Sequence, residues 1–406
     1  MSFQQGLSGL NAASKSLDVI GNNVANASTV GFKGSRAEFA DVYATSLSGA
    51  GGSNIGIGTT VSSVAQQFSQ GNITVTNNPL DVAINGNGFF RLDTNGTITY
   101  SRNGQFRLDK DGYLVNASGQ NVTGYPPNSS GGVTTAAPIP LQVSSADLPP
   151  STTTEASVNV NLDSRAPALS SAAFDLNDST TYQGATSTSV FDSLGNSHSL
   201  SMYFVKTAAN SWDVYGANDG TQIGTTPIGQ VNFLSSGAID TATTTMPIAL
   251  NLPVSTGAQP VTMTLDMTGS TQFGSSFGVN SLAQDGYASG KLTGFSVSAD
   301  GMVTGRYSNG QTRAQGQVAL TSFNNPQGLT SLGNNQWGET TASGPALTGS
   351  PNSGTFGVLQ SGATEDPNID LTAELVNMIT AQRVYQANAQ TIKTQDSVMQ
   401  TLVNLR

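Results

Sequence analysis

The C-terminal stretch Leu371–Arg406 constrains this chain more than any other part of it. It contains no glycine and no proline, although the 406-residue chain holds 46 glycines and 16 prolines. Residues at spacings of three and four form a heptad seam that is apolar at all but two positions. With Asp370 suited to cap the first turn and Glu374 lying within it, we predict one helix roughly 54 Å long. The seam consists of Leu371, Leu375, Met378, Gln382, Tyr385, Ala389, Ile392, Asp396, Met399 and Val403.

A long helix with an apolar stripe needs a partner of similar length, and the N-terminus is the other stretch that offers one. Gly6, Gly9 and Gly21 interrupt it, each at a cost of about 1 kcal/mol relative to alanine, so we expect this helix to form only when packed. We predict a coiled-coil-like helical domain built from both ends, with its seams as the assembly surface. A simpler alternative is two helices that cap one globular core. The N-terminal stripe consists of Phe3, Leu7, Leu10, Ala13, Leu17, Ile20 and Val24.

The composition narrows the class of protein. Only 10% of the residues are charged, against about a quarter in typical soluble proteins. The net charge of −10 argues against nucleic acid or an anionic membrane as a partner. No apolar run is long enough for a transmembrane helix, and the first ten residues show no pattern of a cleavable secretion signal. Cysteine is absent, which excludes disulfides and thiolate chemistry.

Between the two ends, short apolar runs alternate with turn signals, which is typical of antiparallel β structure. The Gly/Ser-rich stretch Ser46–Thr60 is predicted to be a flexible connector. Strand signals begin near Ile73, and the turns Asn103-Gly104 and Asp111-Gly112 predict a meander of short strands.

A second β region follows a proline-rich linker that begins at Tyr125. Its strands start near Val158, and we expect Leu200–Val205 to pair with Trp212–Tyr215. The fold class predicted for the whole chain is therefore α+β, mainly β.

Several of these stretches resemble the bacterial flagellar axial proteins, the rod and hook family. Gly21–Lys33 (GNNVANASTVGFK) resembles the N-terminal signature of that family, and Asp370–Asn388 is similar to its C-terminal one. Tyr100–Phe106 and Asp111–Leu114 resemble its β domain, and Phe191–His198 (FDSLGNSH) resembles hook proteins in particular. The resemblance covers both ends and the flanking β domain well, and the middle of the chain only in patches.

The pattern and the resemblance together predict β domains nested outward from the helical ends. We expect residues 1–70 and 365–406 to form the helical domain with its connector. Residues 71–145 and 286–364 would form a discontinuous β domain, and residues 146–285 an inserted outer β domain.

The resemblance implies a structural subunit of the flagellar hook. Such a subunit would polymerise into a flexible helical tube that acts as a universal joint between rod and filament. The implied partners are further copies of the chain, the distal rod protein, the hook cap, the hook-filament junction protein and the flagellar export apparatus, with the tube outside the cell. Two alternatives are the distal rod protein of the same family, and a secreted β-rich enzyme or carbohydrate-binding protein.

Motifs of enzymes and metal sites are incomplete. Gly274–Gly278 fits the G-x-S-x-G elbow of hydrolases, but the single histidine, His198, precedes it and no helical pattern follows. Asp109–Gly112 lacks the ligands of a calcium loop and is better interpreted as a hairpin turn. We therefore predict no catalytic, cofactor or metal site.

The approach to the C-terminal helix departs from the family pattern. Thr364–Asn368 stands where the family has Ser-Asn-Val. Its carboxylates, Glu365 and Asp366, are interpreted as charges that favour the start of the helix.

Overall fold

The computed structural model describes residues 2–42, 56–128, 131–134, 136–255 and 257–404. The chain divides into two compact units. The first comprises Met1–Ser145, Gly294–Arg306 and Thr312–Arg406, and the second Ala146–Thr293 and Tyr307–Gln311. Most regular elements are strands, and one long helix lies at each end of the chain, so the predicted α+β, mainly β class is confirmed.

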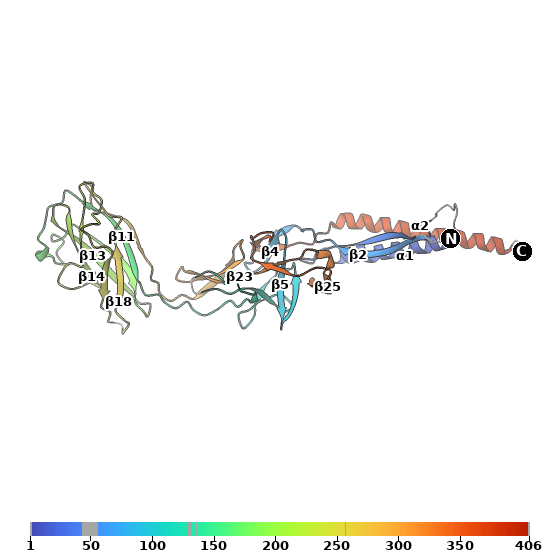
Figure 1. Cartoon of the computed structure of the whole chain (residues 1–406), viewed down its shortest axis with the longest axis horizontal. Helices are drawn as coiled ribbons and strands as arrows, with labels where there is room; N and C mark the ends of the chain where they lie inside the picture. Colours follow the sequence, from blue (N-terminus) through green and yellow to red (C-terminus); the bar gives the residue numbers. More distant parts are fainter. Residues whose placement is uncertain (1, 43–55, 129–130, 135, 256, 405–406) are drawn as a thin grey trace. The chain divides into compact units, whose positions relative to one another are not determined.

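Both terminal helices belong to the first unit, where they pack side by side in opposite directions (Figure 1). Helix α1 spans Ser2–Ala25 and helix α2 spans Leu371–Asn404. Asp370 caps α2 as predicted, because its Oδ1 accepts the backbone N–H groups of Thr372 and Ala373 at 2.9 and 3.1 Å. None of the described helices combines the length and the apolar character needed to cross a membrane.

A two-stranded hairpin lies along α1. It is formed by β1 (Ser35–Val42) and β2 (Gly58–Gln66), which pair in antiparallel register. The prediction of a connector over Ser46–Thr60 is wrong at its end, since β2 starts at Gly58. Its part from 46 to 55 lies outside the described residues. Polar residues dominate β2, so the sequence carries little strand signal there.

The β part of the first unit is built on a large sheet of 13 strands, in which neighbours such as β5 and β6 or β5 and β9 pair in antiparallel register. Two small sheets, β3 with β29 and β4 with β28, join the segment before α2 to the segment after the hairpin. Turns at Asn-Gly and Asp-Gly dipeptides connect several short strands, and two apolar clusters fill the interior. The strands are β3 (Ile73–Val75), β4 (Val82–Asn85), β5 (Phe89–Thr94), β6 (Thr97–Ser101), β7 (Arg107–Leu108), β8 (Leu114–Val115), β9 (Asn121–Tyr125), β10 (Ile139–Pro140), β21 (Leu292–Val297), β22 (Met302–Tyr307), β23 (Thr312–Val318), β24 (Leu320–Ser322), β25 (Thr330–Gly333), β26 (Gln336–Gly338), β27 (Leu347–Gly349), β28 (Val358–Ser361) and β29 (Ala363–Glu365).

One predicted turn is wrong. Asn103-Gly104 does not join two paired strands, because β6 pairs with β5 and β26, whereas β7 pairs with β8. Gly104 instead packs against the backbone of Val82, whose carbonyl oxygen would lie only 1.7 Å from an added Cβ. Only glycine permits this close approach.

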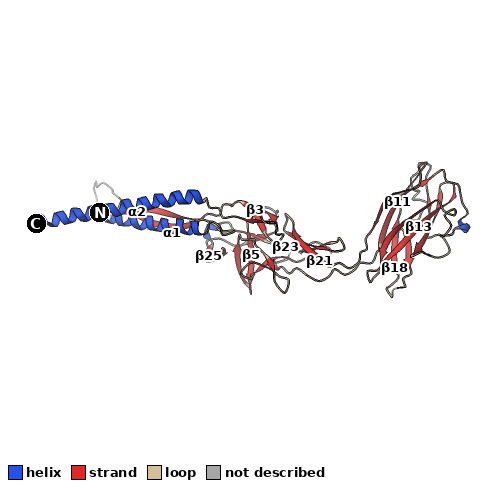
Figure 2. Ribbon diagram, turned by 180° about the vertical axis from the view of Figure 1, so that it is seen from behind, coloured by secondary structure: helices blue, strands red, loops and turns tan. Residues whose placement is uncertain are grey.

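The second unit is a sandwich of two five-stranded sheets (Figure 2). Side chains from both sheets form one apolar core around Trp212 and Phe204. The expected pairing is confirmed, since Tyr203 stands opposite Tyr215 in the antiparallel pair β13–β14. The first sheet contains β11 (Glu155–Asp163), β17 (Ile248–Leu252), β18 (Val261–Asp266), β19 (Thr271–Phe273) and β20 (Gly278–Gln284), and the second β12 (Gly184–Phe191), β13 (Ser197–Ala208), β14 (Ser211–Asn218), β15 (Thr221–Gln222) and β16 (Gly229–Asn232).

Candidate functional site: the terminal helix pair

The contact between α1 and α2 is made by small and polar residues. An added Cβ at Gly6 would lie 3.1 Å from Cγ1 of Ile392, and one at Gly9 would lie 2.7 Å from Oδ1 of Asn388. At the other end of the pair, Asn23 Nδ2 donates a hydrogen bond to Glu374 Oε1 at 3.3 Å. The glycines therefore let the two backbones approach closely.

The predicted seams are only partly used in this contact. Of their members, Ala13 and Ile20 are buried, and a further six are half-buried: Leu10, Leu17, Val24, Met378, Ala389 and Ile392. The remaining apolar members keep exposed side chains, from 38% at Tyr385 to 71% at Val403: Phe3, Leu7, Leu371, Leu375, Tyr385, Met399 and Val403.

Some members of the predicted seams take part in the contact, since Ile392 meets Gly6 and both Ala13 and Ile20 are buried. Other residues of the contact lie next to the seams, such as Gly6 and Gly9 on α1 and Asn388 on α2. Apolar periodicity favours large side chains, so it missed the small residues that lie beside the seams where the two helices approach most closely. The signal that was missed is a second line of small residues at spacings of three and four, in which the glycines are contacts rather than interruptions. Gly21, with nothing within 4 Å of an added Cβ, is the exception.

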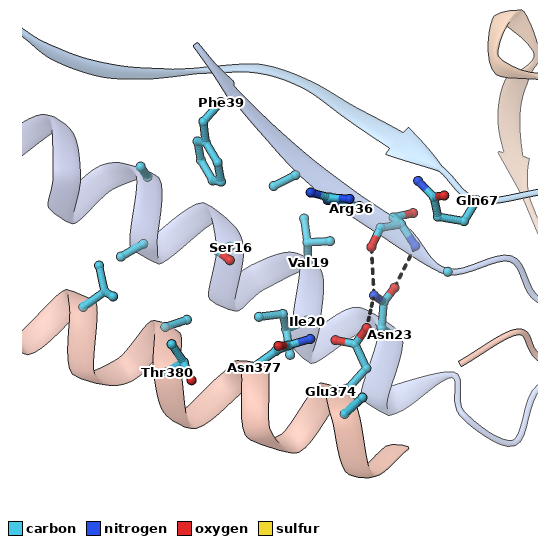
Figure 3. A pocket seen from close by; sticks show the side chains of 18 of the residues that line it. Ser16, Val19, Ile20, Asn23, Arg36, Phe39, Gln67, Glu374, Asn377 and Thr380 are labelled. Atoms are coloured by element: carbon cyan, nitrogen blue, oxygen red, sulfur yellow. Dashed lines mark hydrogen bonds between the residues drawn. The ribbon is translucent and has the colours of Figure 1, made fainter. Parts of the chain in front are cut away.

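A groove of about 900 Å³ lies between α1, α2 and the start of the β1–β2 hairpin (Figure 3). The hairpin is anchored to α1 by Gln5 Nε2, which donates to the Gly56 carbonyl at 2.6 Å, and by Ser8 Oγ, which accepts the Thr59 N–H at 3.3 Å. Apolar and polar side chains share the lining, and Phe39 of β1 extends toward it while remaining exposed. The labelled lining residues are Ser16, Val19, Ile20, Asn23, Arg36, Phe39, Gln67, Glu374, Asn377 and Thr380.

Helix α2 is longer than α1 and extends beyond its start (Figure 1). Gly6 meets Ile392 four residues after the beginning of α1, so the last two turns of α2 have no α1 residue beside them. Val398, Met399 and Val403 are exposed on this free end.

The described residues contain no group of three or more histidine, cysteine, aspartate or glutamate side chains placed to hold a metal ion. Gly274–Gly278 leads from β19 into β20, so a strand directly follows where the hydrolase elbow has a helix. Asp109 Oδ1 accepts the N–H groups of Asp111 and Tyr113 at 3.0 and 2.7 Å, which confirms a turn between β7 and β8.

The single histidine joins two turns of the second unit. Nδ1 of His198 lies 2.7 Å from Asp219 Oδ2, and its Nε2 lies 3.3 Å from Asp192 Oδ2. Burial alone would lower the pKa of His198, but the two carboxylates outweigh it and raise this pKa. His198 is therefore a structural residue.

Four family models match along the chain. Residues 3–33 match the flagella basal body rod protein family, and residues 83–163 the flagellar hook protein FlgE/F/G D1 domain. Residues 161–287 match the flagellar basal body protein FlaE D2 domain, and residues 360–405 the flagellar basal body rod FlgEFG protein C-terminal family.

Relatives match over the full length of the chain. The flagellar hook protein FlgE of Salmonella typhimurium is 44% identical over 420 residues, which cover 100% of both chains. The protein of the same name from Borreliella burgdorferi is 33% identical over 444 residues, covering 100% of this chain and 99% of the relative.

A solved structure supports the fold. The crystal structure of the Helicobacter pylori flagellar hook protein FlgE2 aligns with a TM-score of 0.51 at 14% identity, over 71% of this chain and 99% of that one. Since full-length relatives reach 44% identity, the chain belongs to the flagellar hook protein FlgE family, which is a family of structural proteins.

Proposed function

We propose that this structural subunit of the flagellar hook polymerises through the large apolar side chains of its terminal helices. The observation that carries the proposal is the displaced contact between α1 and α2. Small residues hold the pair together, and leucine, phenylalanine and tyrosine side chains remain exposed beside them. An exposed stripe of this length is costly in water and is typical of an interface.

Neighbouring copies are the occupants that suit this stripe. Leu371 and Leu375 are exposed near the start of α2, and Met399 and Val403 near its free end. Head-to-tail contacts between such unlike surfaces build a helical polymer when the rotation between neighbouring copies does not close a ring. The groove beside α1 offers a further apolar surface to a neighbour.

Each of the three predicted domains would have its own place in the tube. Residues 1–70 and 365–406 would line the tube, and residues 71–145 and 286–364 would form its wall. Residues 146–285 would form outer modules whose neutral Ser, Thr and Asn surfaces slide past one another. A tube built in this way bends and still transmits torque as a universal joint.

The location and the partners follow from this function. The tube would stand outside the cell, made of subunits exported without a cleavable signal. One end would meet the distal rod protein and the other the hook cap and later the hook-filament junction protein. The export apparatus would handle the chain before assembly.

Leu375→Asp tests the proposal. Placing a charge at an apolar interface should raise the critical concentration for polymerisation by more than about tenfold. Sedimentation would measure polymer, electron microscopy would show tubes, and circular dichroism would verify that the β units remain folded. Gln390→Asp introduces the same charge at an exposed polar position of α2 and is the matched control. Normal tubes from Leu375→Asp would contradict the proposal.

A further inference from the structure

Three charged side chains meet in the interior of the first unit. The Lys33 and Glu365 side chains are 0% exposed and that of Arg102 is 5% exposed. Lys33 Nζ lies 2.6 Å from Glu365 Oε1, and Arg102 Nη1 lies 3.3 Å from Glu365 Oε2. One carboxylate therefore serves two buried cations.

These residues come from three distant parts of the sequence. Lys33 lies between α1 and β1, Arg102 follows β6, and Glu365 ends β29 shortly before α2. The interpretation of Glu365 as a helix-start charge is therefore wrong. Asp370 caps α2, whereas Glu365 faces into the protein.

Backbone groups of the connecting segments complete the cluster. Lys33 Nζ also donates to the Ser69 carbonyl at 2.7 Å, and the Gly71 N–H donates to Glu365 Oε1 at 3.0 Å. The Gly31 N–H donates to the Glu365 carbonyl at 2.8 Å. The segments that follow α1, follow β2 and precede α2 thus all converge on Glu365.

Arg102 attaches this junction to the β part of the same unit. Its Nη2 donates to the Gly86 carbonyl at 2.8 Å, and its Nη1 also reaches the Ile84 carbonyl at 3.4 Å. Burial lowers the pKa of Lys33 and that of Arg102, and attraction to Glu365 opposes the change in both. Without the carboxylate, two buried cations would face each other, which is strongly unfavourable.

We propose that Glu365 is a positioning residue for hook assembly, whose buried carboxylate joins Lys33 to Arg102 and thereby fixes both terminal helices to the β part of the first unit. The role of Glu365 in assembly rests on the proposed function, whereas its role in joining Lys33 to Arg102 does not. Two of the three charges, Lys33 and Arg102, come from stretches that resemble the family, whereas Glu365 lies in the stretch Thr364–Asn368 that departs from its pattern.

If the charge of Glu365 matters, and not only its volume, its variants should differ in a way that depends on the neighbouring cations. Glu365→Gln leaves two cations without an anion, so the critical concentration for tubes should rise by about tenfold or more. Lys33→Met in addition removes one of the two cations, so the double variant should assemble better than Glu365→Gln alone. Asp366→Asn is the matched control, because its carboxylate accepts a hydrogen bond from Thr74 in an exposed contact, and its effect should stay within about twofold.

The burial of Lys33 in the junction can be measured in the full-length chain by the rate at which its amino group is acetylated, followed by mass spectrometry. Lys33 should react at least about tenfold more slowly than Lys110, whose side chain is 89% exposed, and Glu365→Gln should remove this protection while Asp366→Asn keeps it. The reaction is run before and after polymerisation. If the wild-type chain forms no tubes, the proposed function fails, and the protection of Lys33 still decides the junction.

Several outcomes would overturn the inference. One is a wild-type Lys33 that reacts as fast as Lys110 in both forms. Others are assembly of Glu365→Gln at the wild-type concentration, or a double variant no better than the single one. If Glu365→Gln does not fold at all, the double variant must fold, and its failure to do so counts against the proposal as well.

Discussion

The second unit and the terminal helix pair bury apolar surface in opposite ways. In the second unit, large side chains such as Trp212 and Phe204 are at most 1% exposed between two sheets of the same chain. In the helix pair, the fully buried apolar residues include Ala13, Ile20 and Ala381, while larger ones stay exposed. One region is complete within a single chain, whereas the other leaves apolar surface that we propose is covered by further copies of the chain.

Deletion of most of the second unit should have the largest effect, and it tests whether this unit folds independently of the first. Leu148 and Gly290 exchange backbone hydrogen bonds of 2.8 and 3.1 Å, and Ser151 and Tyr287 exchange two of 3.0 Å, so the two segments that bound most of this unit lie next to each other. A chain that joins Leu148 to Tyr287 should lose one unfolding transition by calorimetry and keep the other. It should still form tubes, with altered curvature by electron microscopy. Loss of assembly in a folded deletion variant would show that the unit belongs to the axial framework.

Trp212→Ala should destabilise the second unit by about 3–5 kcal/mol, because it leaves a large cavity in a closed core. Its Nε1 also donates to Gln272 Oε1 at 2.7 Å, and that acceptor would lose its partner. In this variant Trp337 is the remaining tryptophan, and it lies in the first unit. Its fluorescence during urea unfolding should therefore show an unchanged transition midpoint for the first unit. Phe273→Ala, at a side chain that is 51% exposed, is the control and should have little effect.

Alanine substitutions at two glycines of α1 distinguish the effect of helix propensity on stability from the effect of packing against α2. Gly21→Ala should stabilise the helix by about 1 kcal/mol, since nothing lies within 4 Å of the added carbon. Gly9→Ala should lose this gain, because its Cβ would lie 2.7 Å from Asn388 Oδ1. Thermal unfolding followed at 222 nm should rank Gly21→Ala above Gly9→Ala. Equal gains would show that α1 and α2 do not approach closely in solution.

The smallest expected effect is a pH dependence confined to the second unit. Since the folded pKa of His198 is raised, its stabilising contribution is fully present below the unfolded value of about 6.5. It is lost as the pH rises through the higher folded pKa. Calorimetry across this window should show a falling transition temperature for the second unit, and His198→Gln should abolish the dependence. NMR of the single histidine would detect an unraised pKa, which would contradict the expectation.

Local patterns in the sequence predicted local structure well. The absence of glycine and proline after Asp370 predicted where α2 begins, and alternation with turn residues predicted the pair β13–β14. The same patterns could not predict which side of α2 meets α1, because that depends on small residues 350 or more positions away in the chain. Apolar periodicity reports large side chains and does not distinguish a contact within the chain from one between copies.

The buried charges were beyond prediction for a similar reason. Lys33, Arg102 and Glu365 lie in three separate parts of the sequence, and no local spacing relates them. Because Glu365 lies close to the start of a helix, a favourable interaction with that helix was the simplest local explanation for its charge. In the structure its partner is instead Lys33, 332 residues earlier in the sequence.

The distance in sequence between the two halves of the junction has a kinetic consequence. Lys33 and Glu365 are 332 positions apart, and Asn23 and Glu374 are 351 apart, so neither contact can form until almost the whole chain is available. Contacts this remote form late, whereas the hairpin contacts of the second unit form early. When the chain becomes available from its N-terminal end, every residue of the second unit is present before Glu365 and Glu374 are. We therefore expect the sandwich to fold first and the helices to pair last, so that the complete assembly surface forms only when the whole chain is present.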